Sequence, residues 1–243
     1  MNKRVILVNG PSGSGKTATL RNLDFSKTIY LNLDAKTELP FGGELEMMKF
    51  LTPKSALQVN VSLQELEETD ADTIVVDTLS FYITALESEV AGKENGFDGW
   101  ATYSNAIKEL LDFSHRKSKK SWIFLSHTQL GDSGNLQAMV KGSMKNLSIE
   151  SYFSTVLELF TYELATPNHF DSVVGYGMQT KKTLENRKSS AKSPFGLFPR
   201  DGKIMNNDID LVLRRLSGEK IDWDDNEVLF AKDKQLIERL NNQ

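Results

Sequence analysis

The amino-acid sequence predicts an α/β fold, in which a mainly parallel central β-sheet is flanked by helices and extended by a C-terminal β-hairpin. Two features support this prediction. Short apolar runs rich in β-branched residues end in polar residues, as buried parallel strands do, and segments of helical periodicity separate these runs. The 243 residues, 39% of them hydrophobic and 26% charged, suit one large domain. We expect this core over residues 1–216, followed by an acidic tail with a short helix over residues 217–243.

Composition excludes several kinds of chemistry. The chain contains no cysteine, so disulfides, thiolate nucleophiles and cysteine-based zinc sites are excluded. Its net charge of −4 means that any nucleic-acid contact must come from a local basic patch. No apolar run has the length of a membrane span or of a signal peptide, so we expect a cytoplasmic protein that does not bind membranes.

The first predicted strand leads into a glycine-rich loop at residues 10–17. This loop reads G-x-x-x-x-G-K-T, the phosphate-binding sequence called Walker A. Its glycines let several backbone N–H groups converge on one anion, Lys16 supplies a cation for the β- and γ-phosphates, and the Thr17 hydroxyl is placed to bind Mg²⁺. A helix over residues 18–23 is expected to point its positive end at the same phosphates. The sequence therefore predicts an ATP–Mg²⁺ site formed by Gly10, Pro11, Ser12, Gly13, Ser14, Gly15, Lys16, Thr17 and Ala18.

A second strand is predicted over residues 27–34 and ends at Asp34. Ligands of parallel α/β sheets lie beyond the carboxyl ends of strands, so Asp34 either faces the nucleotide or merely opens a turn or caps a helix. Short helices are expected over residues 44–51 and 62–69.

The apolar run at residues 72–78 has the pattern called Walker B, a strand that ends in an acid, here Asp77. It lies about 60 residues after Walker A, which is a usual distance. We expect the Asp77 carboxylate to bind Mg²⁺ together with Thr17.

Helices are predicted over residues 81–90 and 99–115, and a buried strand over residues 121–127. His127 ends that strand and either senses the γ-phosphate or only forms hydrogen bonds with the loop. The polar segment that follows, residues 128–146, is expected to have little regular structure and to be functional or disordered.

Two strands over residues 154–164 and 172–180, joined by a turn, form the predicted hairpin. The next segment, residues 181–203, holds seven basic and two acidic residues. It suits contact with DNA phosphates or with an ATP bound by a neighbouring subunit, although a solvated hairpin arm remains an alternative. Helices are expected over residues 209–216 and 232–240.

This order of motifs resembles the RecA-type ATPase core, and it is most similar to small phage-encoded RecA-like ATPases associated with single-strand-annealing recombination. The match is carried by residues 10–17, 34–41, 74–80, 124–127 and 191–198.

The resemblance implies an ATPase in which Lys16, Thr17 and Asp77 bind phosphate and Mg²⁺. His127 would couple the γ-phosphate to a DNA-binding loop at residues 128–146, with a smaller loop at residues 91–97. RecA-like proteins take a general base, a Glu, from the end of the second strand, where this chain has Asp34 with Glu38 nearby. Cations that reach a neighbour's ATP would be Lys181, Lys182, Arg187 and Lys192.

The implied partners are further copies of the chain in a filament or ring, single-stranded DNA, and a phage annealing or single-strand-binding protein in the host cell cytoplasm. Two alternatives stay open. One is a nucleoside or small-molecule kinase that uses the same loop, for which the sequence has no clear Arg-rich lid. The other is an ATP-gated loader with little turnover.

Overall fold

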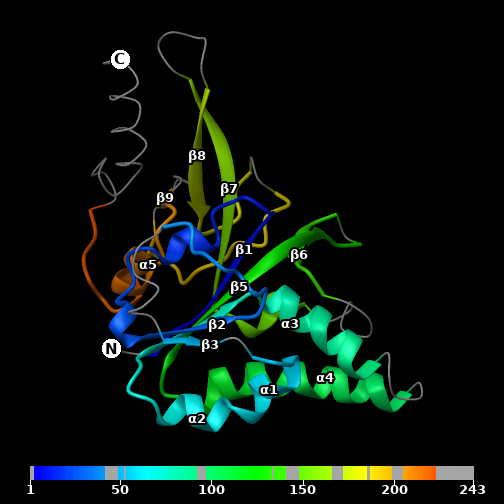
Figure 1. The fold of residues 1–243 in the computed structure, drawn as a ribbon. Coiled ribbons are helices and arrows are strands. Elements are labelled where there is room, and N and C mark those ends of the chain that lie inside the picture. The colour runs from blue at the N-terminus through cyan, green and yellow to red at the C-terminus, as the bar shows by residue number, and fades with distance from the viewer. Residues whose placement is uncertain are drawn as a thin grey trace.

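The computed structural model describes the chain over nine stretches (Figure 1). These are residues 3–41, 49–51, 53–91, 97–132, 134–140, 148–165, 172–184, 187–198 and 205–222. Most of the predicted acidic tail, including the expected helix over residues 232–240, lies outside them, as do residues 92–96 and 141–147 of the two predicted loops.

Within the described residues, nine strands join one sheet, in the order β3-β2-β4-β5-β1-β7-β8-β9 with β6 paired to β5. The strands are β1 (Val5–Gly10), β2 (Thr28–Asn32), β3 (Lys49–Leu51), β4 (Thr73–Asp77), β5 (Ser121–Leu130), β6 (Leu136–Ala138), β7 (Thr155–Ala165), β8 (Ser172–Gln179) and β9 (Met205–Asn206). The six strands from β3 to β7 in this order run parallel, and β8, β9 and β6 pair antiparallel. The predicted α/β fold with a mainly parallel sheet and a hairpin extension is therefore confirmed.

Helices cover both faces of the sheet (Figure 1). On one face lie α1 (Ala56–Val61), α2 (Leu63–Glu68), α3 (Leu79–Leu86) and α4 (Phe97–Asp112), and on the other lies α5 (Ile209–Leu216). Single π-helical turns extend α3 over Glu87–Ala91 and α4 over Phe113–Lys117. Asp208 caps α5, because its side chain accepts a hydrogen bond from the Asp210 backbone N–H.

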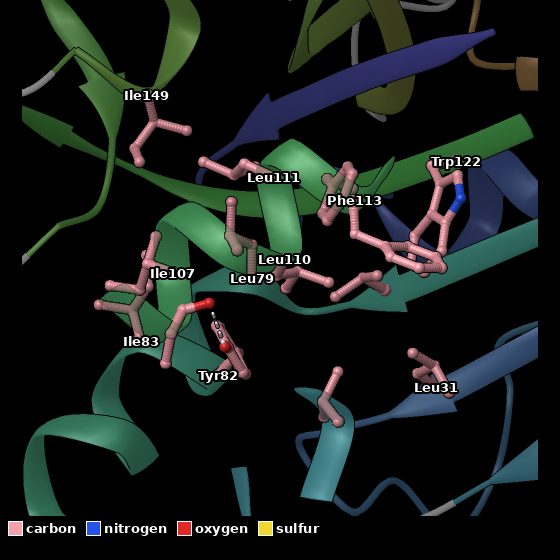
Figure 2. Packing of buried hydrophobic residues seen from close by; sticks show 14 of the residues in the cluster. Leu31, Leu79, Tyr82, Ile83, Ile107, Leu110, Leu111, Phe113, Trp122 and Ile149 are labelled. Atoms are coloured by element: carbon pink, nitrogen blue, oxygen red, sulfur yellow. Dashed lines mark hydrogen bonds between the residues drawn. The ribbon is translucent and has the colours of Figure 1, made fainter. Parts of the chain in front are cut away.

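The two faces of the sheet bury separate hydrophobic clusters, because successive side chains of a strand point to opposite sides. In β1, Leu7 faces the cluster under α1 to α4, whereas Ile6 and Val8 face the cluster under α5. Figure 2 shows side chains of α3 and α4 packed over the first cluster, where the Tyr82 hydroxyl donates a hydrogen bond to the Ala106 carbonyl at 3.1 Å. Burial of both faces explains why the parallel strands read as continuous apolar runs.

The prediction of little regular structure over residues 128–146 was wrong for its first part. Strand β5 continues to Leu130 and turns back at Gly131 into β6, which pairs antiparallel with it. Gly134 supplies the left-handed conformation in this turn, with φ of 73°. The sequence did not predict this hairpin, because its mostly polar side chains lack the apolar alternation by which strands are recognised.

Two predicted helices were also wrong. In place of the helix expected over residues 18–23, the glycine-rich loop is followed by a 3₁₀ turn, Thr17–Leu20. Asp24 then caps another 3₁₀ turn, Phe25–Lys27, which leads into β2. Residues 49–51 of the segment expected to be helical form β3, which pairs parallel with β2 at the sheet edge; residues 44–48 lie outside the described residues. In both places long-range pairing and chain length override local helix propensity.

In the described part of the chain, no helix is both long enough and apolar enough to cross a bilayer.

Candidate nucleotide-binding site

The glycine-rich loop connects β1 to the 3₁₀ turn and encloses the head of Lys16. Gly13 and Gly15 both adopt left-handed backbone conformations, with φ of 78° and 82°, which a residue with a side chain rarely takes. The Lys16 Nζ donates hydrogen bonds to the Gly10 carbonyl at 3.0 Å and the Pro11 carbonyl at 2.7 Å. A phosphate in this loop would therefore replace these neutral carbonyl acceptors of Lys16 with anionic oxygens.

The loop and the end of β4 meet at one buried carboxylate. Asp77 is fully buried, and its Oδ2 accepts hydrogen bonds from the Thr17 hydroxyl at 2.8 Å and from the Tyr30 hydroxyl at 2.6 Å. Its Oδ1 is buried and lacks a hydrogen-bond partner within the described residues. The two residues predicted to bind magnesium are thus in contact, and one carboxylate oxygen remains available.

A cavity of about 590 Å³ opens beside this pair. It is lined by Ser12, Gly13, Gly15, Lys16, Thr17, Ala18, Asp34, Lys36, Pro40, Thr78, Phe81, His127 and Tyr176. Most of the predicted site residues therefore surround one space. Glu38 is exposed and does not belong to this lining, whereas Asp34 does. The fully buried Asp77 is not in the lining either, but it contacts two residues that are, Thr17 and Lys36.

Asp34 pairs with Lys36, a residue that belongs to no recognisable sequence motif. Its Oδ2 lies 2.9 Å from the Nζ of Lys36, which also lies 2.7 Å from Asp77 Oδ2. Asp34 follows β2 at the carboxyl edge of the sheet, as expected for a residue that faces the ligand.

His127 lies at the rim of the cavity in the middle of β5. Its backbone N–H donates to the Ser80 hydroxyl at 2.8 Å, and its ring lies 6.4 Å from the ring of Phe81, centroid to centroid. Partial burial, reinforced by the nearby Lys16 ammonium, lowers the pKa of His127, which favours the neutral imidazole.

Burial also shapes the titration of the other site residues. It lowers the pKa of Lys16 to about 8, and the charge of Asp77 only partly opposes this shift. The pKa of the Tyr30 hydroxyl is raised, first by burial and then by the adjacent Asp77, so Tyr30 acts as a hydrogen-bond donor throughout the physiological range.

Several residues of the site left no recognisable pattern in the sequence. Tyr30 and Lys36 belong to or follow β2, and Tyr176 comes from β8, where it lies over Gly15: a Cβ added to that glycine would be 3.1 Å from the Tyr176 ring. Asn207, just before α5, donates from Nδ2 to the Gly15 carbonyl at 2.9 Å. Only the pairing of distant strands brings these side chains to the loop.

The donor set fits magnesium bound together with a nucleotide. Mg²⁺ is usually held by one or two carboxylates, a hydroxyl and substrate phosphates, and keeps several waters. The Thr17 hydroxyl and the partnerless Asp77 Oδ1 match this pattern. Among the described residues, no group of three or more His, Cys, Asp or Glu side chains offers an all-protein metal site.

Comparison with known proteins identifies no family for this chain. No protein-family model matches it, and no curated protein matches it. Solved structures do match, in 220 chains. One is described as the RadB recombinase, with 18% sequence identity, coverage of 72% of this chain and 87% of that chain, and a TM-score of 0.45. At this identity and TM-score, no conclusion about this chain is drawn from the match.

Proposed function

We propose that this protein is an ATPase of the RecA-like class that acts in phage DNA recombination, with ATP-dependent binding of single-stranded DNA. The observation that carries the proposal is the contact between Thr17 and Asp77 at the cavity that also receives Lys16 and His127. It joins the phosphate-binding loop, the acid of the Walker B strand and the proposed γ-phosphate sensor in one site.

In the proposed mechanism, Lys16 binds the β- and γ-phosphates and neutralises charge that develops during transfer. Thr17 and Asp77 hold Mg²⁺, which supplies further positive charge to the phosphate oxygens when bound. Asp34, which lines the cavity, orients the attacking water; Glu38 is the weaker candidate because it lies outside the lining.

A continuous set of contacts supports coupling between this site and a DNA-binding surface. Beyond His127, β5 continues into the β5–β6 hairpin, where the Leu136 backbone N–H donates to the Lys188 carbonyl at 2.7 Å. Lys182 Nζ contacts Asn135 Oδ1 of the same hairpin at 3.4 Å. We propose that occupation of the γ-phosphate position biases this hairpin and the basic residues of the segment 181–203 towards binding DNA phosphates.

Buried Glu150 provides a second connection between the nucleotide site and the β5–β6 hairpin, because it contacts both β1 and β6. Its Oε1 accepts from the Ala138 backbone N–H of β6 and, at 3.4 Å, from the Asn9 side chain of β1, the strand that leads into the glycine-rich loop. A displacement of the loop would therefore reach β6 through a single carboxylate.

The test is ATP hydrolysis with and without single-stranded DNA, combined with DNA binding in the presence of a non-hydrolysable ATP analogue at low salt. Stimulated hydrolysis and analogue-dependent binding are expected. Replacement of exposed Lys182 and Lys188 by alanine should weaken DNA binding and reduce its salt dependence, since each lost phosphate contact removes about 0.7 from the slope of log affinity against log salt. Replacement of exposed Lys117, which ends the π-helical turn after α4, and of exposed Lys119, just beyond that turn, removes the same charge and should have little effect.

The recombination role would be contradicted if single-stranded DNA failed to stimulate hydrolysis and the ATP analogue failed to promote DNA binding. Unchanged nucleotide affinity in Lys16→Ala would contradict the nucleotide site itself. The His127→Ala variant should still bind nucleotide, but the bound nucleotide should no longer strengthen DNA binding. This variant therefore separates the coupling between the two sites from nucleotide binding itself.

One observation favours a second candidate, an ATP-gated loader with little turnover. Lys36 pairs with Asp34 at 2.9 Å and so competes for the carboxylate that would orient water. Very slow hydrolysis together with tight, nucleotide-dependent binding of an annealing or single-strand-binding protein would support this candidate. The proposed homo-oligomer, a filament or ring in which basic residues such as Arg187 or Lys192 reach a neighbour's ATP, is compatible with both.

A further inference from the structure

The ammonium of Lys36 lies where two predicted magnesium ligands meet. Its Nζ is 2.7 Å from Asp77 Oδ2, 2.8 Å from Thr17 Oγ1 and 2.9 Å from Asp34 Oδ2. One cation therefore contacts both the hydroxyl and the carboxylate that a divalent ion would use. None of these contacts is local to the Walker A or Walker B sequence, because Lys36 comes from the segment after β2.

The backbone of Lys36 is fixed independently of its side chain. The buried Asn32 side chain, at the end of β2, donates from Nδ2 to the Lys36 carbonyl and accepts at Oδ1 from the Lys36 N–H, both at 2.9 Å. Between them, Ala35 has a φ of 52°, in the left-handed region that an L-residue enters at a cost. This clamped turn places the lysine next to Asp77.

The side chain itself is not locked in. Lys36 is 28% exposed and lines the cavity, whereas the Asp77 side chain is fully buried. The lysine head can therefore leave for the cavity, while the carboxylate stays and needs another cation in its place, because a buried charge is stable only when it is paired.

We propose that Lys36 is a built-in counter-ion that competes with the divalent metal for the Thr17–Asp77 pair. The pair holds either the lysine ammonium or the metal ion. Mg²⁺ would bind the Thr17 oxygen at about 2.0–2.1 Å, and that oxygen, which lies 2.8 Å from Lys36 Nζ, cannot hold both cations at these distances. Lys36 neutralises the buried carboxylate while no metal is bound, and it is displaced into the nucleotide cavity when the metal enters. This inference rests on the proposed function only in taking Thr17 and Asp77 as metal ligands.

The competition is measured with Mn²⁺ alone, without nucleotide, by the electron paramagnetic resonance signal of the free ion. Lys36→Met keeps the apolar stem and removes the charge, so it should bind Mn²⁺ at least about tenfold more tightly than the wild type, which corresponds to roughly 1.4 kcal/mol. Lys27→Met, which changes an exposed lysine of the preceding 3₁₀ turn, is the matched control and should match the wild type. Asp77→Asn should abolish the gain in the Lys36→Met background.

A second measurement needs no substitution. Lysine acetylation followed by mass spectrometry should show Lys36 reacting several-fold faster when Mn²⁺ is added to the wild type, while Lys27 reacts at an unchanged rate. Equal Mn²⁺ affinity in the wild type and Lys36→Met, or Lys36 acetylation that is insensitive to the metal, would overturn the inference. Because neither readout involves hydrolysis or DNA, a failure of the recombination proposal leaves the result interpretable.

Discussion

The Thr17 hydroxyl donates a hydrogen bond of 2.8 Å to Asp77, across a separation of 60 residues in sequence. Thr17 ends the glycine-rich loop after β1, and Asp77 ends β4, two strands between which β5 lies in the sheet. The parallel register brings both strand ends to the same edge, where Tyr30 of the neighbouring β2 donates to the same carboxylate. The site is organised around this one buried acid.

Removal of the Tyr30 hydroxyl tests that organisation. Tyr30→Phe deletes a donor to a charged, buried acceptor, which is expected to cost about 1.5–3 kcal/mol of unfolding free energy. The matched variant is Tyr82→Phe. The Tyr82 hydroxyl lies equally close to an acceptor, 2.6 Å from Asn60 Oδ1, but both this acceptor and the Ala106 carbonyl at 3.1 Å are neutral, so a loss of about 0.5–1.5 kcal/mol is expected. Denaturant unfolding measures both, and a larger loss in Tyr82→Phe would argue against a charged Asp77.

The pH dependence of nucleotide binding should report Lys16. Its pKa of about 8 in the nucleotide-free protein is lowered by burial, and only the charged ammonium attracts phosphate. The affinity for nucleotide should therefore be highest below about pH 7 and fall as the pH rises through 8, by up to about tenfold per pH unit. The fall should end at the pKa that Lys16 has in the nucleotide complex. Calorimetric titration between about pH 7 and pH 9.5 measures this. The Lys16→Arg variant keeps its charge across this range, so its affinity for nucleotide should not change with pH. A parallel decline in the wild type and the variant would show that another group causes the pH dependence.

The two left-handed glycines of the loop should differ in their tolerance of alanine. At Gly13 a Cβ meets open space, so Gly13→Ala carries only the backbone cost, about 1–2 kcal/mol. At Gly15 the Cβ would lie 2.5 Å from Asn207 Nδ2, so Gly15→Ala should lose about 1–3 kcal/mol more through overpacking. Thermal unfolding compares the two. Asn207→Ala should destabilise the Gly15→Ala background less than the wild type; additive losses would mean that the two residues do not meet.

Tyr176 is expected to form part of the surface that receives the nucleobase. The ring is 43% exposed, lines the cavity and lies over Gly15, which suits an aromatic platform for stacking worth about 1–3 kcal/mol per base. Tyr176→Ala should therefore weaken ATP binding by roughly tenfold or more and leave inorganic triphosphate binding unchanged. The control is Val174→Ala, which changes an exposed residue on the same strand and should leave the affinities for ATP and triphosphate unchanged. Equal losses for ATP and triphosphate would indicate an effect on the loop.

Comparison of Asp34→Asn with Glu38→Gln decides which carboxylate orients the attacking water. Only Asp34 lines the cavity, so we expect its variant to lower the rate of hydrolysis by about 10²-fold or more at saturating ATP, with the Glu38 variant close to the wild type. Single-turnover hydrolysis measures the chemical step directly. The opposite ranking would place Glu38 in the site once nucleotide is bound.

Much of the fold followed from local rules of the chain. The apolar runs that end at Gly10, Asp77 and His127 predict buried parallel strands, because a strand covered on both faces must be apolar throughout. The short connection after the loop did not become the expected helix, since it must return to β2 within a few residues. The β5–β6 hairpin was not predicted, because it is held by backbone hydrogen bonds and its polar side chains lack the apolar alternation that indicates a strand.

The sequence alone determined the phosphate-binding loop, the strand-terminal Asp77 and the α/β class, because glycine placement and apolar periodicity act on neighbouring residues. The tertiary structure alone decided that Lys36 pairs with Asp77, that Tyr176 lies over the loop, and that Asp34 rather than Glu38 lines the cavity. These relationships join segments far apart in the chain, and side chains of ordinary type acquire their surroundings only when strand order and register bring those segments together.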